Sequence, residues 1–408
     1  MTKTKFPIVI STFLTLLNDR LGESIVFPLL PFLLANFQTD GRTLGLLAGS
    51  YALAQFAATP LIGALSDRFG RKPVIASCVT GSIIGLGLFA LTISLKWPPE
   101  SFLPLILLFS ARLIDGISGG TAATASAVLA DISPPEQRAK AFGLIGVAFG
   151  FGFILGPFLG GKLAQQSVTL PVWVATGFAL VNLAVVLKFL PETHPKESRI
   201  SIPQKRKLNP FTKIKRIMLN PHVGKLSLAF FLFFLAFNGF TAILVLFFKE
   251  KLNWGPELST TAFLIVGIVA TFVQGGLIGP LVKKFKERKL TLFGLGLVII
   301  GAIIIALTKE GQSSTSIFIA VGILAFGTGL VTPCLRSLVS RKLDTEGQGT
   351  ALGSLQALQS LGSFIGPALA GLSYDILGKS SPFIGASIVV MIVIPLVSRE
   401  THKTVSPD

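Results

Sequence analysis

The chain contains twelve apolar segments, each long enough to cross a lipid bilayer as a helix. A spanning helix needs about 20 predominantly apolar residues, and a bilayer offers the backbone no hydrogen-bond partners outside its own helix. The segments therefore predict an all-α membrane protein with twelve transmembrane helices. They cover residues 6–37, 44–65, 73–94, 103–130, 139–163, 171–190, 226–248, 259–282, 290–307, 315–339, 349–374 and 381–397.

Charged residues make up only 13% of the 408 residues, about half the share found in soluble globular proteins. Lys and Arg outnumber Asp and Glu by 36 to 19, which in a soluble chain would indicate nucleic-acid binding. Here most basic residues fall on the side that carries both termini, so the positive-inside rule places the termini in the cytoplasm. We expect a multi-pass protein of a bacterial inner membrane, with the lipid bilayer as a partner and no nucleic acid.

The sequence shows no pattern for a cofactor, a metal site or a catalytic centre, and the chain is not expected to be an enzyme. Cys78 and Cys334 lie in different apolar segments, and all three histidines lie in polar stretches. The phosphate-binding pattern Gly-x4-Gly-Lys-Ser/Thr is absent, so ATP is not the expected energy source.

A polar, basic stretch divides the chain into two halves that resemble each other. We expect an N-terminal six-helix bundle at 1–191, a basic cytoplasmic linker at 192–225 and a C-terminal six-helix bundle at 226–408. Glycines and prolines recur at a spacing of 210 residues, as in Gly156-Pro157 and Gly366-Pro367. Such a repeat predicts two bundles related by an axis along the membrane normal, with a pathway between them.

Four motifs in the first half carry a family resemblance. The first two are Gly63-Ala-Leu-Ser-Asp67-Arg68-Phe-Gly70-Arg71-Lys72 and Leu21-Gly22 followed by Pro28 and Pro31; the others are Gly143-x8-Gly152-x3-Gly156-Pro157-x2-Gly160-Gly161 and Arg112-Leu-Ile-Asp115-Gly116. The first and last resemble motifs of the major facilitator superfamily, and the other two resemble motifs of its twelve-helix drug:proton antiporters. Asp115 departs from the amide or apolar residue that is commoner there. The resemblance is closest to the tetracycline-efflux and multidrug branch and implies transport by alternating access.

The loop motif predicts a gate on the cytoplasmic face. Asp67 lies at a helix end among three cations, and a carboxylate placed against a helix N-terminus is favoured by the dipole and the free amides. The start of the eleventh helix, near Glu346, is the candidate partner in the other half; a solvated turn is the alternative. The predicted gating residues are Gly63, Asp67, Arg68, Gly70, Arg71, Lys72 and Glu346.

The fifth predicted helix carries glycines on one face. Gly152, Gly156 and Gly160 are four residues apart, which permits backbone-close helix packing. The family resemblance adds a bending role at the interface between the halves, and packing alone is the alternative. The residues of this predicted hinge are Gly143, Gly152, Gly156, Pro157, Gly160 and Gly161.

Five charged residues lie inside predicted helices, all in the first half: Asp19, Arg20, Glu23, Arg112 and Asp115. Because an ionised side chain is costly in a bilayer, such residues mark proton or substrate paths. Three carboxylates face two permanently charged arginines, so one carboxylate lacks a cation of its own and is available to bind a proton. We expect Asp19 to be the main proton site and Glu23 the second. Two self-satisfied ion pairs that hold helices one and four together are the alternative.

Amide side chains at mid-depth predict the substrate cavity between the halves. Isolated amides beside phenylalanines suit an amphipathic compound better than a sugar. We expect a monomer that couples the efflux of small amphipathic drugs or metabolites to protons. A metabolite facilitator or proton symporter is one alternative, and a non-transporting receptor or scaffold is another. The candidate substrate contacts are Gln55, Asn238, Gln274, Gln356 and Gln359.

Overall fold

The computed structural model describes residues 6–37, 39–98, 100–133, 138–199, 210–221, 223–340 and 345–398. Within these ranges the chain is helical and has no strand. Nine helices among the described residues are long and apolar enough to cross a membrane. One of them, Pro256–Ala306, covers two predicted segments. The prediction of an all-α membrane protein is confirmed, and the helices are consistent with twelve spans.

Among its described residues, the first half of the chain forms ten helical elements. Pro28 and Pro31 divide the first predicted segment, because proline removes a backbone donor and clashes with the preceding turn. Gly119 and Gly120 separate α5 from α6. The elements are α1 (Phe6–Val26), η1 (Phe27–Leu29), α2 (Leu30–Leu33), η2 (Ala35–Phe37), α3 (Gly41–Phe69), α4 (Arg71–Ser94), α5 (Leu103–Ser118), α6 (Thr121–Ile132), α7 (Arg138–Ala164) and α8 (Leu170–Phe189).

After α8, the described residues form the remaining spans and two short elements of the predicted linker. A π-helical turn lies between α12 and α13, and α14, α15 and α16 each continue past an internal proline. The elements are η4 (Lys196–Ser198), α10 (Pro210–Met218), α11 (Gly224–Leu252), α12 (Pro256–Phe272), η5 (Val273–Leu277), α13 (Ile278–Ala306), α14 (Ser314–Ser340), α15 (Thr345–Leu377) and α16 (Ser381–Ser398).

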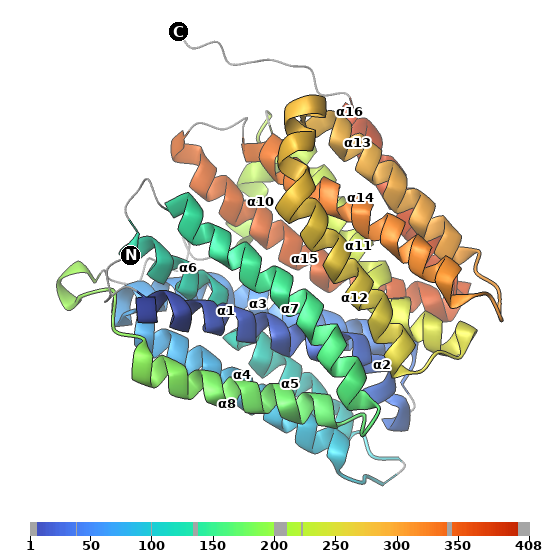
Figure 1. Ribbon diagram of the computed structural model, residues 1–408, viewed down its shortest axis with the longest axis horizontal. Helices are drawn as coiled ribbons and strands as arrows, with labels where there is room; N and C mark the ends of the chain where they lie inside the picture. Colours follow the sequence, from blue (N-terminus) through green and yellow to red (C-terminus); the bar gives the residue numbers. More distant parts are fainter. Residues whose placement is uncertain are drawn as a thin grey trace.

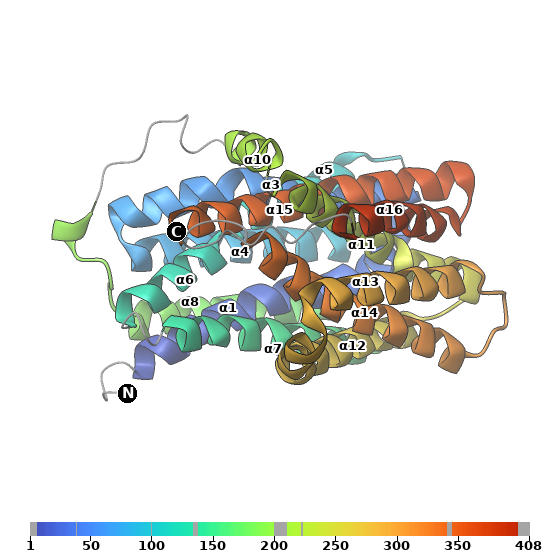
Figure 2. The ribbon, with the colours of Figure 1, turned by 90° about the horizontal axis from the view of Figure 1, so that it is seen from above.

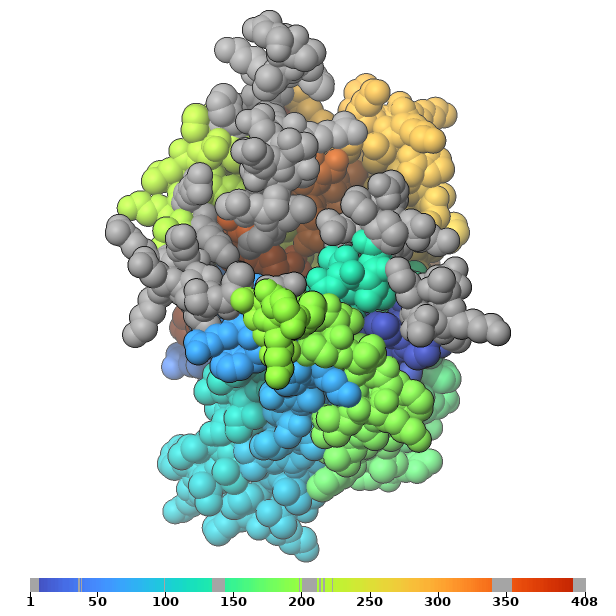
Figure 3. Space-filling model, turned by 90° about the vertical axis from the view of Figure 1, so that its left-hand side faces the viewer, coloured from blue at the N-terminus to red at the C-terminus, as the bar shows by residue number. Residues whose placement is uncertain are grey.

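The spanning helices pack as two sets (Figures 1 and 2). In the first set α1 packs on α7 and α8, and α4 on α5 and α8; in the second α11 packs on α15 and α16, and α13 on α14 and α16. The sets meet where α3 packs on α15 and where α7 packs on α12. Figure 3 views the molecule from the side near α6 and α10, where the first set fills the lower part and the second the upper. The domain boundaries at 191 and 225 stay predictions.

The contacts between the sets gather toward one end of the bundle. This end, where α3 begins at Gly41 and α15 ends at Leu377, is called the far face below; the opposite end, where α1 begins, is the near face. Gly49 of α3 lies against Phe364 of α15, and Gly267 of α12 lies against Phe153 of α7. A Cβ atom at Gly49 would stand 2.7 Å from the Phe364 carbonyl oxygen, so glycine is what permits this approach.

Candidate functional site

One arginine of α1 holds both acids of that helix. Arg20 donates to Asp19 at 2.8 Å and to Glu23 at 2.6 Å. The side chains of Asp19, Arg20 and Glu23 are 6%, 14% and 28% exposed, so the three charges lie largely inside the protein. The Arg20 guanidinium also stands 4.5 Å from the ring centre of Phe149 on α7, within the range of a cation–π contact.

The second arginine lies on α5, four residues from Gly116. Arg112 is 3.7 Å from Asp115 and 4.8 Å from the ring centre of Tyr51 on α3. Its Nε and Nη1 atoms are buried and have no hydrogen-bond partner among the described residues. The arginine is therefore paired only loosely, which leaves it free to act on other charges nearby.

Tyr51 connects the two charged groups. Asp19, Glu23 and Asp115 all lie within electrostatic range of its hydroxyl. Gln55, one turn along α3, lies 3.4 Å from the same hydroxyl and donates to the Gly119 carbonyl at 3.0 Å. The structure thus brings the five predicted proton-coupling residues and one predicted substrate contact into a single polar site between α1, α3 and α5.

The predicted hinge glycines of α7 lie against α1. A Cβ at Gly152 would stand 2.6 Å from the Arg20 Cβ, and one at Gly156 would overlap the Ser24 hydroxyl. The Ser24 hydroxyl lies 2.8 Å from the Gly152 carbonyl and also within reach of the Arg20 carbonyl. Gly160 approaches Ile25, whereas Gly161 faces Thr260 of α12 in the other set. The surroundings of Gly143 lie outside the described residues.

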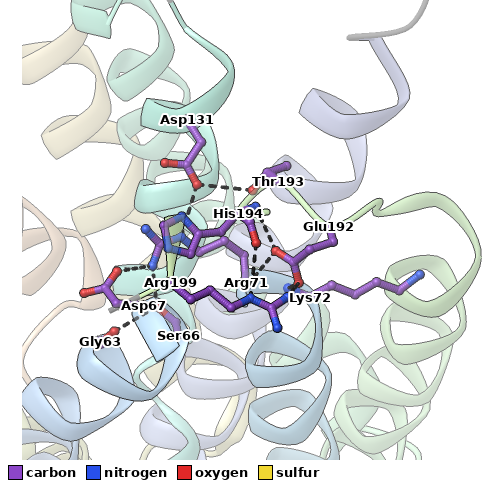
Figure 4. Close-up of polar contacts among 10 residues, drawn as sticks. All are labelled: Gly63, Ser66, Asp67, Arg71, Lys72, Asp131, Glu192, Thr193, His194 and Arg199. Carbon is purple, nitrogen blue, oxygen red and sulfur yellow. Dashed lines mark hydrogen bonds and ion pairs between the residues drawn. The ribbon is translucent and has the colours of Figure 1, made fainter. Parts of the chain in front are cut away.

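The predicted gating residues Asp67 and Arg71 belong to a network of hydrogen bonds and ion pairs on the near face (Figure 4). Arg71 pairs with Asp67 and donates to Asp131 of α6 at 3.1 Å and to the Ser66 hydroxyl at 2.7 Å. All these residues belong to the first set. The side chain of Glu346 lies outside the described residues, so the predicted contact with α15 stays a prediction. A Cβ at Gly63 would meet nothing, so no close approach occurs there in this conformation.

Glu192 closes the same network from the segment that follows α8. Its carboxylate accepts hydrogen bonds from the backbone amides of Arg71 at 2.8 Å and Lys72 at 3.3 Å, at the start of α4 (Figure 4). The preceding Gly70 has a φ of 102°, a backbone that favours glycine, and a Cβ there would overlap Glu192. The sequence analysis did not assign Glu192 a role, because its partner is 120 residues away in the chain. Arg68 stacks over Phe69, and Lys72 donates to the Leu187 carbonyl.

Comparison with known proteins decides the family. The family model described as Major Facilitator Superfamily matches residues 12–367. The chain belongs to the major facilitator superfamily. It is 32% identical to the Escherichia coli tetracycline resistance protein of class C over 363 residues, which is 88% of each chain. It is 28% identical to the Staphylococcus aureus quinolone resistance protein NorA over 405 residues, covering 99% of this chain and 98% of NorA.

A solved structure of the superfamily agrees with this fold. The human organic anion transporter MFSD10 superimposes with a TM-score of 0.72 at 26% sequence identity, over 97% of this chain and 100% of that one. The charged site and the near-face network described above therefore belong to a membrane transporter and not to an enzyme.

The far face of this transporter holds a second helix N-terminus that is bound by an acid. Asp375, at the end of α15, accepts hydrogen bonds from the backbone amides of Gly41 at 2.9 Å and Arg42 at 2.7 Å, where α3 begins. Asp40, the residue before α3, caps the same turn; a hydrogen bond from Thr43 holds the pKa of its carboxyl below the usual value. The Asp375 contact joins the two helix sets, whereas the Glu192 contact lies within one.

The other predicted substrate contacts lie apart from the charged site. Asn238 donates to the Phe234 carbonyl of its own helix at 2.8 Å, and Gln359 accepts from Arg336 at 3.0 Å. Gln274 and Gln356 are exposed. Arg336 lies inside α14, so a spanning helix of the second half also carries a charged residue, whereas the expected intramembrane charges all lie in the first half.

Proposed function

We propose that this transporter exports amphipathic, drug-like molecules in exchange for protons that enter the cell. Tetracycline-like and quinolone-like compounds are the first substrate classes to try, because two of its relatives are named for resistance to them. The observation that carries the proposal is the position of Arg20, which serves both Asp19 and Glu23.

One cation shared by two acids, of which Asp19 is 6% and Glu23 28% exposed, supports proton binding at this place. When both acids are ionised, the pair carries one negative charge more than Arg20 neutralises, and a membrane interior disfavours such a charge. Protonation of Asp19 removes the excess negative charge, and Arg20 then pairs with Glu23 alone. A substrate that approaches Arg112 and Gln55 changes the local charge and favours release of that proton. The proton and the substrate therefore compete for the site.

Alternating access provides the route across the membrane, and the proton gradient sets the direction of drug transport. The packing of α3 on α15 and of α7 on α12 toward the far face supports a conformation that is closed there. We infer that the far face points out of the cell, that both termini lie in the cytoplasm of a bacterium, and that the protein acts as a monomer. Opening of the far face breaks the Asp375 contact, and closure of the near face brings the Asp67 loop against the start of α15.

Everted membrane vesicles test the proposed function. A pH gradient is established by respiration, and a tetracycline or a quinolone is then added. Antiport is expected to dissipate the gradient as the drug enters the vesicle and protons leave. A facilitator would carry the drug without changing the gradient, a symporter would change it in the opposite sense, and a receptor or scaffold would move neither; each of these three results refutes the proposal.

A further inference from the structure

A polar stripe on α1 leads from the charged site toward the near face. Ser11, Thr15, Asp19 and Glu23 are four residues apart, so their side chains lie above one another on one face of the helix. Ser11 and Thr15 are fully buried, and Asp19 is far less exposed than Glu23. Asp19 therefore lies in the packed interior of the first helix set.

Asn182 of α8 extends this stripe across a helix interface. The Thr15 hydroxyl lies 3.2 Å from Asn182 Oδ1 and 2.8 Å from the Ser11 carbonyl oxygen, and it can donate to either. Because a hydroxyl has one hydrogen and can also accept, Thr15 can turn between these partners and take a hydrogen bond from a third group. A hydroxyl that relays protons needs this freedom.

Two buried atoms beside the stripe have no hydrogen-bond partner among the described residues. They are Nδ2 of Asn182, whose residue is only 4% exposed, and Oγ1 of Thr124 on α6. Buried polar atoms almost always have a partner, so these exceptions call for an ordered water or a functional role.

Both atoms are close to the surroundings of Asp19. Helix α6, which carries Thr124, packs on α1. Asn182 is reached through Thr15, one turn before Asp19. Helices α6 and α8 of the first set, which both pack on α1, thus bring polar groups toward the α1 stripe.

We propose that Ser11, Thr15 and Asn182 line the path by which protons leave Asp19 for the cytoplasm, separate from the drug pathway between the helix sets. The inference rests on the proposed function. Asp19 gives its proton to a water held by Asn182 and Thr15, and that water passes one of its own protons on toward Ser11. Water and hydroxyls end as they began, and only Asp19 changes charge. Asn182 is a positioning residue, since its amide holds the water and orients the Thr15 hydroxyl without taking up a proton.

The test uses the full-length protein in proteoliposomes, with the tetracycline or quinolone that the wild type carries as the probe. Two rates are measured: drug accumulation driven by a pH gradient, and drug–drug exchange at equal pH, which needs no net proton movement. Thr15→Val and Asn182→Leu are expected to slow accumulation about tenfold and to change exchange by less than about twofold. Asn182→Ser, which leaves room for water and keeps a hydrogen-bonding group, is expected to recover part of the accumulation.

Thr176→Val is the matched control, because Thr176 is also buried on α8 but donates to the Val172 carbonyl of its own helix. Both of its rates are expected to equal those of the wild type. The proposal is overturned if the two rates fall together in Thr15→Val and Asn182→Leu, which marks a packing defect, or if neither rate falls. A wild type in which a pH gradient drives no accumulation refutes the proposed proton coupling itself, before any variant is compared.

Discussion

The two halves use the same glycine contact to support different chemistry. Gly152 of α7 lies against Arg20 and Leu21 of α1, and Gly362 of α15 lies against Phe234 and Leu235 of α11. Where the first half places a charged group, the second places an aromatic one: Phe230 and Phe233, like Phe234, are buried. The repeated glycines therefore fix how closely the helices pack, whereas the residues beside them decide what each half does. We therefore expect the coupled protons to bind in the first half.

The turn that follows α3 and the kink inside α13 show the same division. Gly70 and Lys286 both have a positive φ, 102° and 66°, directly before a buried charged residue. In the first loop that residue is Arg71, bound to Asp67 and Asp131; in the second it is Glu287, which contacts Ser337 at 3.3 Å. The backbone turn is kept, and the sign of the buried charge is reversed.

The largest effect is expected from removing the charge that distinguishes the halves. Asp19→Asn should reduce pH-driven drug accumulation about 100-fold, because an amide at this place cannot bind and release the coupled proton. Phe234→Leu, beside the matching glycine of the other half, should retain most of this activity. Accumulation in proteoliposomes measures both. An Asp19→Asn variant that accumulates drug as the wild type does would refute the role assigned to Asp19.

The overlaps created by a Cβ atom at these glycines should differ in whether a second substitution can relieve them. A Cβ at Gly156 would overlap a side chain, that of Ser24, whereas a Cβ at Gly366 would overlap the backbone carbonyl of Leu235. Both Gly156→Ala and Gly366→Ala should destabilise by about 1–3 kcal/mol, the usual result of overpacking. Ser24→Gly should recover part of the loss in Gly156→Ala.

No side-chain substitution at Leu235 should relieve Gly366→Ala, because the overlapping atom belongs to the main chain. Thermal unfolding in detergent compares the two single glycine variants with Gly156→Ala/Ser24→Gly and Gly366→Ala/Leu235→Gly. Equal recovery in both halves would contradict the geometry given for them.

The two contacts between the helix sets should also differ. Asp375 binds backbone amides of α3, whereas Lys162 and Glu257, which join α7 to α12 at 3.3 Å, are both more than half exposed. Asp375→Ala should open the far face and speed maleimide labelling of an Ala48→Cys variant about tenfold, since hydrogen bonds to charged groups contribute about 1.5–3 kcal/mol. The labelling background replaces Cys78 and Cys334 with alanine.

Glu257→Gln is the control for this labelling, because exposed ion pairs contribute about 0–1 kcal/mol. The labelling rate should then stay close to that of the parent. Faster labelling in Glu257→Gln than in Asp375→Ala would mean that the α7–α12 contact, and not the α3–α15 contact, holds the far face closed.

The smallest effect is expected from substitutions at two positive-φ residues, Lys286 and Gly70. Lys286→Gly should stabilise the protein by about 1 kcal/mol, because a side chain at φ 66° and ψ 154° is strained and glycine is not. Gly70→Ala should destabilise it, since the same strain is introduced beside Glu192. Unfolding temperatures compare the two, and a loss of stability in Lys286→Gly would show that its side chain contributes more than the strain costs.

Hydropathy predicted the helices well, because a spanning helix must be apolar over its whole length whatever its neighbours are. The same reasoning missed α10, since a nine-residue helix with three basic residues has too little apolar length; it nevertheless packs on α3 and α15, with Phe211 against Phe56. The cation–π partner of Arg20, and the roles of Glu192, Asn182 and Asp375, come from contacts between distant segments, which spacing along one helix does not reveal.

Proton release on drug binding tests the central claim most directly. The purified protein is mixed with its drug in weakly buffered detergent solution, and the pH change is recorded. Wild type is expected to release protons as the drug binds, and the Asp19→Asn/Glu23→Gln double variant is expected to bind the drug and release none. Drug binding to the wild type without proton release, or equal release from the double variant, would contradict the account.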